Sequence, residues 1–173
     1  MPATLLEKFP TLNHVAATEP PPLRVLRDRG APLPAPLTAF IGREKALAEL
    51  GSVVRETRLV TLTGPGGSGK TRLAIEAARA LQSEFEDGVA WIELAPVSDA
   101  SLVPQTVASA LGIRCQPGRV VSDSISEYLA ARRMLLVLDN CEHVIESTAD
   151  LVLSLLRQAP NVNVLTTSRE RLT

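Results

Sequence analysis

Apolar and polar residues follow two different periods along the chain, and each period predicts a different kind of element. Short runs of branched and aliphatic side chains predict β-strands at 58–63, 89–94, 134–139 and 161–167. Apolar residues at spacings of three and four predict helices at about 44–55, 72–82 and 99–111, and another from 147 to Pro160. Strands that alternate with helices are typical of an α/β fold with a parallel sheet.

The run at 134–139, Met-Leu-Leu-Val-Leu-Asp, has no polar residue before its final aspartate. A strand of this kind is buried on both faces, which requires helices on each side of the sheet. We therefore expect a fold of three layers. Before this strand, Ser124 and Glu127 have the spacing of a capping box, which predicts that a short helix begins there and ends near Arg132.

The first 37 residues differ in composition from the rest of the chain. Eight of the thirteen prolines lie there. Proline removes a backbone donor and restricts the residue before it, so we expect residues 1–37 to be an extended linker with little packed structure. The folded domain is predicted to cover residues 38–173.

The composition narrows the class of protein. A chain of 173 residues with 45% apolar content is long enough for one domain with a real core. Its 18 basic and 19 acidic residues nearly cancel, so we expect no direct contact with nucleic acid and no attraction to an anionic membrane. The two cysteines do not form a C-x-x-C motif, which fits reduced thiols better than a disulfide framework. No apolar run reaches the roughly 18 residues of a membrane span. The start of the chain does not resemble a secretory signal. We therefore expect a cytoplasmic protein.

Residues 64–71, Gly-Pro-Gly-Gly-Ser-Gly-Lys-Thr, match the phosphate-binding pattern G-x-x-x-x-G-K-[ST] between a predicted strand and a predicted helix. Glycines let successive backbone N–H groups turn inward around phosphate oxygens, and the N-terminus of the next helix favours the same anion. Lys70 is predicted to contact the β and γ phosphates of a nucleotide, and Thr71 to offer its hydroxyl to Mg2+. The predicted phosphate-binding residues are Gly64, Pro65, Gly66, Gly67, Ser68, Gly69, Lys70, Thr71 and Arg72.

Asp139 ends the buried strand at 134–139. Because ligands bind at the carboxyl ends of parallel strands, we expect Asp139 beside the phosphate-binding loop, where it holds Mg2+ together with Thr71. Its alternative role is to cap the loop or helix that follows the strand. Trp91, in the strand at 89–94, is expected in the core, and its alternative role is a stacking platform for adenine.

Four stretches of the chain, taken in order, resemble one family. They are Phe40–Glu44, the loop at 64–71, the run from Leu135 to His143, and Leu165–Glu170. Together they are similar to the NB-ARC-like, or STAND, group of bacterial signal-transducing P-loop NTPases. The likeness covers roughly residues 20–173 and is closest to the nucleotide-binding module of large LuxR-type and SARP-type transcriptional regulators.

The resemblance implies a role for each matched position. Ile41, Gly42 and Arg43 would contribute to the adenine side of a pocket for ATP or ADP. Asp139 would be the Walker B acid on Mg2+, and Arg169 the sensor that contacts the γ-phosphate. The family's sheet would place the last strand of this chain in the centre, in the order 2-3-4-1, with the family's fifth strand missing. The implied partners are the nucleotide and the other domains or partner proteins of a regulator.

One departure from the family bears on catalysis. Many ATPases of this class carry a second acid directly after the Walker B aspartate, whereas this chain has Asn140, with Glu142 two residues later. Asparagine cannot take a proton from water, so we expect slow or no hydrolysis unless Glu142 replaces the missing acid. The candidate catalytic residues are Lys70, Asp139, Glu142 and Arg169. The leading prediction is an ATP/ADP switch module, and the alternatives are an active AAA+-type ATPase and a truncated, non-catalytic interaction fragment.

Overall fold

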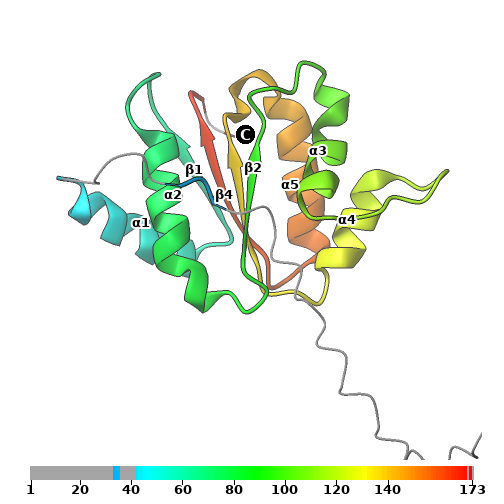
Figure 1. Ribbon diagram of the computed structural model, residues 1–173, viewed down its shortest axis with the longest axis horizontal. Coiled ribbons are helices and arrows are strands. Elements are labelled where there is room, and N and C mark those ends of the chain that lie inside the picture. Colours follow the sequence, from blue (N-terminus) through cyan, green and yellow to red (C-terminus); the bar gives the residue numbers. More distant parts are fainter. Residues whose placement is uncertain (1–32, 36–41, 171, 173) are drawn as a thin grey trace, which may run out of the picture.

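The computed structural model describes residues 33–35, 42–170 and 172. In this part of the chain, strands and helices alternate as the sequence predicts (Figure 1). The strands are β1 (Leu59–Thr63), β2 (Val89–Glu93), β3 (Leu135–Asp139) and β4 (Asn163–Ser168). The α-helices are α1 (Glu44–Glu56), α2 (Lys70–Leu81), α3 (Val103–Ala110), α4 (Val121–Leu129) and α5 (Ile145–Gln158). Short 3-10 helices lie between them at η1 (Gln82–Glu84), η2 (Ala100–Leu102) and η3 (Cys141–His143).

The described strands form one parallel sheet in the order β1-β4-β3-β2. The last strand of the chain, β4, therefore lies between β1 and β3, which confirms the order 2-3-4-1. Because parallel strands all point the same way, their carboxyl ends lie at one edge of the sheet, the upper edge in Figure 1. The residues that follow β1, β3 and β4 are thereby brought to the same place.

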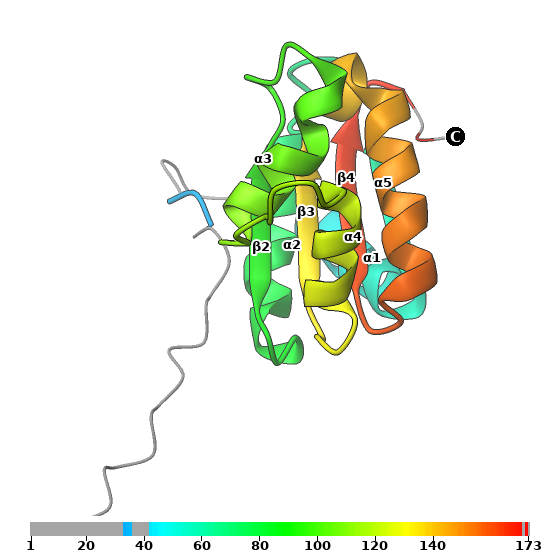
Figure 2. The same cartoon turned by 90° about the vertical axis from the view of Figure 1, so that its right-hand side faces the viewer.

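Helices cover both faces of the sheet, which confirms the three layers (Figure 2). Helices α1 and α2 pack on one face, and α3, α4 and α5 pack on the other (Figures 1 and 2). Every residue of β3 is buried, and its side chains alternate between the two cores: Leu135 and Val137 face α2, while Leu136 and Leu138 face the opposite layer. Full burial of each such side chain contributes about 1.5–3 kcal/mol. Asp139, the last residue of β3, is thus carried by a firmly packed strand.

Arg58, directly before β1, links the sheet to the end of α5. Its guanidinium donates hydrogen bonds to the carbonyl oxygens of Leu156 at 2.8 Å, Ala159 at 2.6 Å and Val162 at 3.4 Å. The last carbonyl groups of an α-helix have no partner within the helix, so a cation at this end also matches the helix dipole. This contact fixes the segment through which the chain enters β4.

The capping-box prediction for α4 is wrong. The helix begins at Val121, so Ser124 already lies inside it, and the Ser124 hydroxyl lies 3.5 Å from the carbonyl oxygen of Val120. Val121 packs against the same core as Ile125, four residues later. Burial of this additional apolar side chain explains why the helix starts a turn earlier than the local polar pattern indicates.

Several smaller predictions can be compared with the structure. Trp91 is buried in the core between α2 and the sheet, as predicted. The helix predicted at 99–111 is divided into η2 and α3, and α5 begins at Ile145, two residues before the predicted start. In the described residues, no helix combines the length and the apolar character that crossing a membrane requires.

Most of the predicted linker lies outside the described residues, so its extended character stays a prediction. Near its end, Leu33 packs against the core that α1 and α2 share with the sheet. Arg79, on α2, donates a hydrogen bond to the carbonyl oxygen of Pro34. The described part of the linker therefore contacts the folded domain.

Candidate nucleotide-binding site

The glycine loop between β1 and α2 has a backbone that needs glycine. Gly67 and Gly69 have φ angles of 74° and 83°, in the left-handed region that side chains with a Cβ atom rarely enter. Gly69 is also the N-cap residue of α2, where an added Cβ atom would lie only 3.0 Å from the guanidinium of Arg43. The first N–H groups of an α-helix have no partner within the helix, and here they follow directly on the loop. The loop therefore has the form of an anion site.

Lys70 is the first residue of α2, and its side chain folds back over the loop. Its Nζ atom donates hydrogen bonds to the carbonyl oxygen of Gly64 at 2.8 Å and to that of Pro65 at 3.1 Å. The ammonium group thus lies near the N-terminal end of the helix, where the helix dipole is also positive. These two sources of positive potential favour phosphate at this position.

Asp139 lies beside Thr71, as the sequence predicts for a metal site. The Thr71 hydroxyl is 2.9 Å from Asp139 Oδ1 and 3.2 Å from Oδ2, although 68 residues separate them in the chain. The aspartate is 5% exposed. A hydroxyl and a carboxylate are hard oxygen donors, and Mg2+ is commonly held by one or two such protein groups together with the phosphates of a nucleotide. The residues present therefore fit Mg2+.

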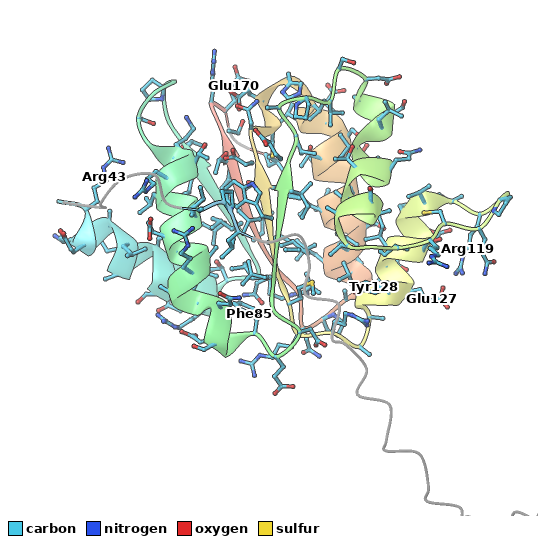
Figure 3. The ribbon with its side chains drawn as sticks, in the orientation of Figure 1. Arg43, Phe85, Arg119, Glu127, Tyr128 and Glu170 are labelled. Atoms are coloured by element: carbon cyan, nitrogen blue, oxygen red, sulfur yellow. The ribbon has the colours of Figure 1, made fainter. Side chains whose placement is uncertain are left out.

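Arg169 and Glu142 form an ion pair next to the loop. Arg169 Nε lies 3.1 Å from Glu142 Oε1, with the arginine side chain 66% exposed and the glutamate side chain 20% exposed. The Arg169 guanidinium also reaches the loop, because a Cβ atom on Gly66 would lie 3.7 Å from it. Figure 3 shows the next residue, Glu170, at the tip of β4 on the upper edge of the sheet. The structure thus places the predicted sensor arginine beside the glycine loop.

These groups surround a cleft of about 470 Å3. The predicted residues that line it are Gly66, Gly67, Gly69, Lys70, Thr71, Arg72, Glu142 and Arg169. Gly64, Pro65 and Ser68 complete the loop, and Asp139 reaches the site through Thr71. The cleft is also lined by Ile75, Asn140 and Thr167, to which the sequence analysis assigned no binding role.

Thr167 could have been found from the alternation of side chains along β4. Leu165 faces the α2 layer, so the side chain two residues later faces the same layer, as Asp139 does on the neighbouring strand. The adjacent Thr166 faces away, towards β1, where its hydroxyl lies 3.0 Å from that of Thr61. Only one of these two neighbouring threonines can therefore serve the site.

Gly42 and Arg43, two of the residues predicted for the adenine side, lie directly before α1. Figure 3 shows Arg43 beside the N-terminal part of α2, in agreement with its contact at Gly69. Gly42 donates its N–H to the Glu44 carboxylate at 3.1 Å, and hydrogen bonds from the backbone of Glu44 and of Gly42 lower the pKa of Glu44. Ile41 lies outside the described residues. The role of these positions in binding adenine stays a prediction.

A family model described as the NB-ARC domain matches residues 43–172 of the chain. The match includes the glycine loop, Asp139 and Arg169. The chain belongs to the NB-ARC family. Its NB-ARC module is a P-loop unit of the kind found in transcriptional regulators, which confirms the resemblance seen in the sequence motifs.

The NB-ARC module is similar to parts of much longer regulators. A protein of Mycobacterium tuberculosis, provisionally named as an HTH-type transcriptional regulator, is 48% identical over 119 residues, which are 69% of this chain and 13% of that protein. The regulatory protein AfsR of Streptomyces griseus is 30% identical over 155 residues, covering 82% of this chain and 15% of that protein. The chain thus spans less than a sixth of the length of either relative.

A solved structure supports the fold. The STAND protein with a tetratricopeptide repeat sensor from Pyrococcus horikoshii matches with a TM-score of 0.51 at 18% identity, over 85% of this chain and 22% of that chain. At this level of identity the likeness concerns the fold alone. It agrees with the three-layer α/β arrangement of the NB-ARC module.

Proposed function

We propose that the NB-ARC module is a nucleotide-dependent switch of a cytoplasmic LuxR-type or SARP-type transcriptional regulator. It binds ATP or ADP with Mg2+ in the cleft beside the glycine loop and hydrolyses ATP slowly or not at all. The other domains of the regulator respond to which nucleotide is bound. Support comes from the family match and from relatives that are named as regulators.

Each group in the cleft has a part in this proposal. The loop amides and Lys70 hold the phosphates, and Arg72 adds a further cation to the lining. Thr71 and Asp139 are the protein ligands of Mg2+, which supplies charge neutralisation to the phosphates when it is bound. Gly42 and Arg43 are proposed to contact the base, and Ile41, which lies outside the described residues, keeps the same proposed role from the family resemblance.

The observation that carries the switch is the ion pair between Arg169 and Glu142. Both side chains line the cleft, so a terminal phosphate bound there competes with the Glu142 carboxylate for the same guanidinium. ATP and ADP differ in that terminal phosphate. A module that binds the two nucleotides with different arrangements of Arg169 has the differential affinity that a switch requires.

Slow hydrolysis is supported by the residues next to Asp139. Asn140 lines the cleft with a left-handed φ of 66°, and its amide side chain cannot take a proton from water. Glu142 could take that proton, but one of its oxygens is engaged by Arg169. The alternative of an active AAA+-type ATPase requires Glu142 to exchange this partner.

Calorimetric titration with ATP and with ADP, each with and without Mg2+, tests the proposal. Lys70→Ala removes a charged donor, and we expect nucleotide affinity to fall by about 10- to 100-fold. Lys45→Ala is the matched control, because Lys45 lies on α1 with 92% of its side chain exposed. Full affinity in the Lys70→Ala variant, or no binding of either nucleotide by the unsubstituted chain, would refute the proposal. A turnover above about one per second favours the active ATPase.

A further inference from the structure

Asp139 receives a second hydroxyl from the strand beside it. The Thr167 hydroxyl lies 2.6 Å from Asp139 Oδ1, the oxygen that Thr71 also approaches at 2.9 Å. Thr167 is 1% exposed and belongs to β4, an inner strand of the sheet that lies beside β3. The Walker B position is thus held from α2 on one side and from the sheet on the other.

The direction of the Thr167 hydrogen bond is fixed by its surroundings. The backbone N–H of Asn140 donates to Thr167 Oγ1 at 2.9 Å, so the hydroxyl oxygen already acts as an acceptor. A hydroxyl has a single proton, and a carboxylate only accepts. The Thr167 proton therefore points to Asp139 Oδ1.

The same threonine also stabilises the chain turn after β3. Asn140 has a φ of 66°, the one positive value among the described residues other than glycine. Residues other than glycine rarely adopt this conformation, although asparagine tolerates it better than most. The hydrogen bond from the Asn140 N–H to Thr167 keeps the chain in this turn directly after the metal ligand.

We propose that Thr167 is a positioning residue that orients the Asp139 carboxylate for Mg2+. This inference rests on the proposed nucleotide site and deepens it. Partners of a metal ligand typically change metal affinity by about 10- to 100-fold when they are removed. A role limited to folding would instead lower stability and leave the dependence of nucleotide binding on Mg2+ unchanged.

The experiment compares three substitutions by calorimetry with ADP, in excess Mg2+ and in EDTA. Thr167→Val removes the hydroxyl at nearly constant shape, and Thr167→Ser keeps the hydroxyl. Thr166→Val is the matched control, because that buried hydroxyl bonds to β1 and faces away from the site. The measured quantity is the ratio of the two dissociation constants, without and with Mg2+.

We expect Thr167→Val to lower this ratio by about tenfold or more, with little change of the affinity in EDTA. Thr167→Ser and Thr166→Val are expected to keep the ratio of the unsubstituted chain. An unchanged ratio in Thr167→Val would overturn the inference and leave the nucleotide site standing. If the unsubstituted chain shows no dependence on Mg2+, the metal site of the proposed function fails as well.

Folding of each variant is checked by urea denaturation, followed by the fluorescence of Trp91, the single tryptophan. If Thr167→Val does not fold, Thr167→Ala also removes the hydroxyl and places no γ-methyl group in the space that the hydroxyl occupied. A ratio as high in that variant as in Thr167→Ser would overturn the inference.

Discussion

Removing the charge of Glu142 tests the proposed switch most directly. Glu142→Gln keeps the size of the side chain and its ability to accept a hydrogen bond, and it removes one negative charge from the cleft. Arg169 is then held by a neutral acceptor when a phosphate competes for it. We expect this variant to bind ATP more tightly than the unsubstituted chain.

The expected size follows from the exposure of the pair. The arginine side chain is 66% exposed and the Arg169 Nε to Glu142 Oε1 distance is 3.1 Å. An ion pair this exposed contributes about 0.2–1 kcal/mol, or a factor of about 1.5 to 5 in an equilibrium constant. The loss of repulsion between Glu142 and the phosphate charge acts in the same direction. We expect ATP affinity to rise by about three- to tenfold and ADP affinity by less, because ADP carries less charge.

The assay is calorimetric titration with each nucleotide at about 0.05 M and about 0.5 M salt. The gain should be smaller at high salt, because salt screens exposed charges. Glu146→Gln is the matched control, since Glu146 is exposed in the first turn of α5. An ATP affinity that stays unchanged or falls in Glu142→Gln would show that the carboxylate does not compete with phosphate for Arg169.

Three further predictions concern stability and thiol chemistry. Arg58→Ala should lower the free energy of unfolding by about 2–4 kcal/mol, because carbonyl groups at the end of α5 lose a charged donor. Urea denaturation measures this loss. Arg157→Ala is the control, because Arg157 is exposed, and it should change the free energy of unfolding by less than about 0.5 kcal/mol. A loss below about 1 kcal/mol in Arg58→Ala would contradict the role of this contact. Burial, with the nearby charges of Asp139 and Glu142, raises the pKa of the Cys141 thiol to about 12. At pH 8 a disulfide reagent should therefore modify the exposed Cys115 and react with Cys141 only after unfolding. The thiol loses its proton near its ordinary pKa of 9.0 in the unfolded chain, but only near pH 12 in the folded chain. The contribution of Cys141 to stability is therefore complete below about pH 9 and should be lost as the pH rises towards 12. Comparing the pH dependence of the free energy of unfolding with that of Cys141→Ala measures this.

The fold could be predicted where local pattern and burial agree. The apolar run of β3 predicted a strand covered on both faces, and the structure confirms it. The sheet order came from the family resemblance, because spacing along a chain does not say which parallel strands are neighbours. The start of α4 was missed, since a polar pattern at Ser124 competes with the burial of Val121, and only the packed structure shows which of the two decides.

The residues of the site likewise divide into those that a local sequence pattern predicts and those that only the packed structure reveals. Glycines before a helix and an acid after a buried strand are local patterns, and parallel strands bring them together. For Thr167 the alternation along β4 predicts only the face of the sheet, and threonine is common in strands for reasons of shape alone. Its role depends on a neighbour 28 residues away in the chain and becomes visible only when β4 lies next to β3.

Glu142 also distinguishes the proposed switch from an active ATPase, because its carboxylate has a different role in each function. In a switch, its carboxylate holds Arg169 until a phosphate replaces it. In an ATPase, Glu142 would have to take the proton of the attacking water, since Asn140 cannot. Loss of a general base typically lowers turnover by about 10²- to 10⁴-fold, so an enzyme that depends on Glu142 would lose activity in Glu142→Gln. Tighter ATP binding with unchanged slow turnover supports the switch, and loss of a fast turnover supports the ATPase.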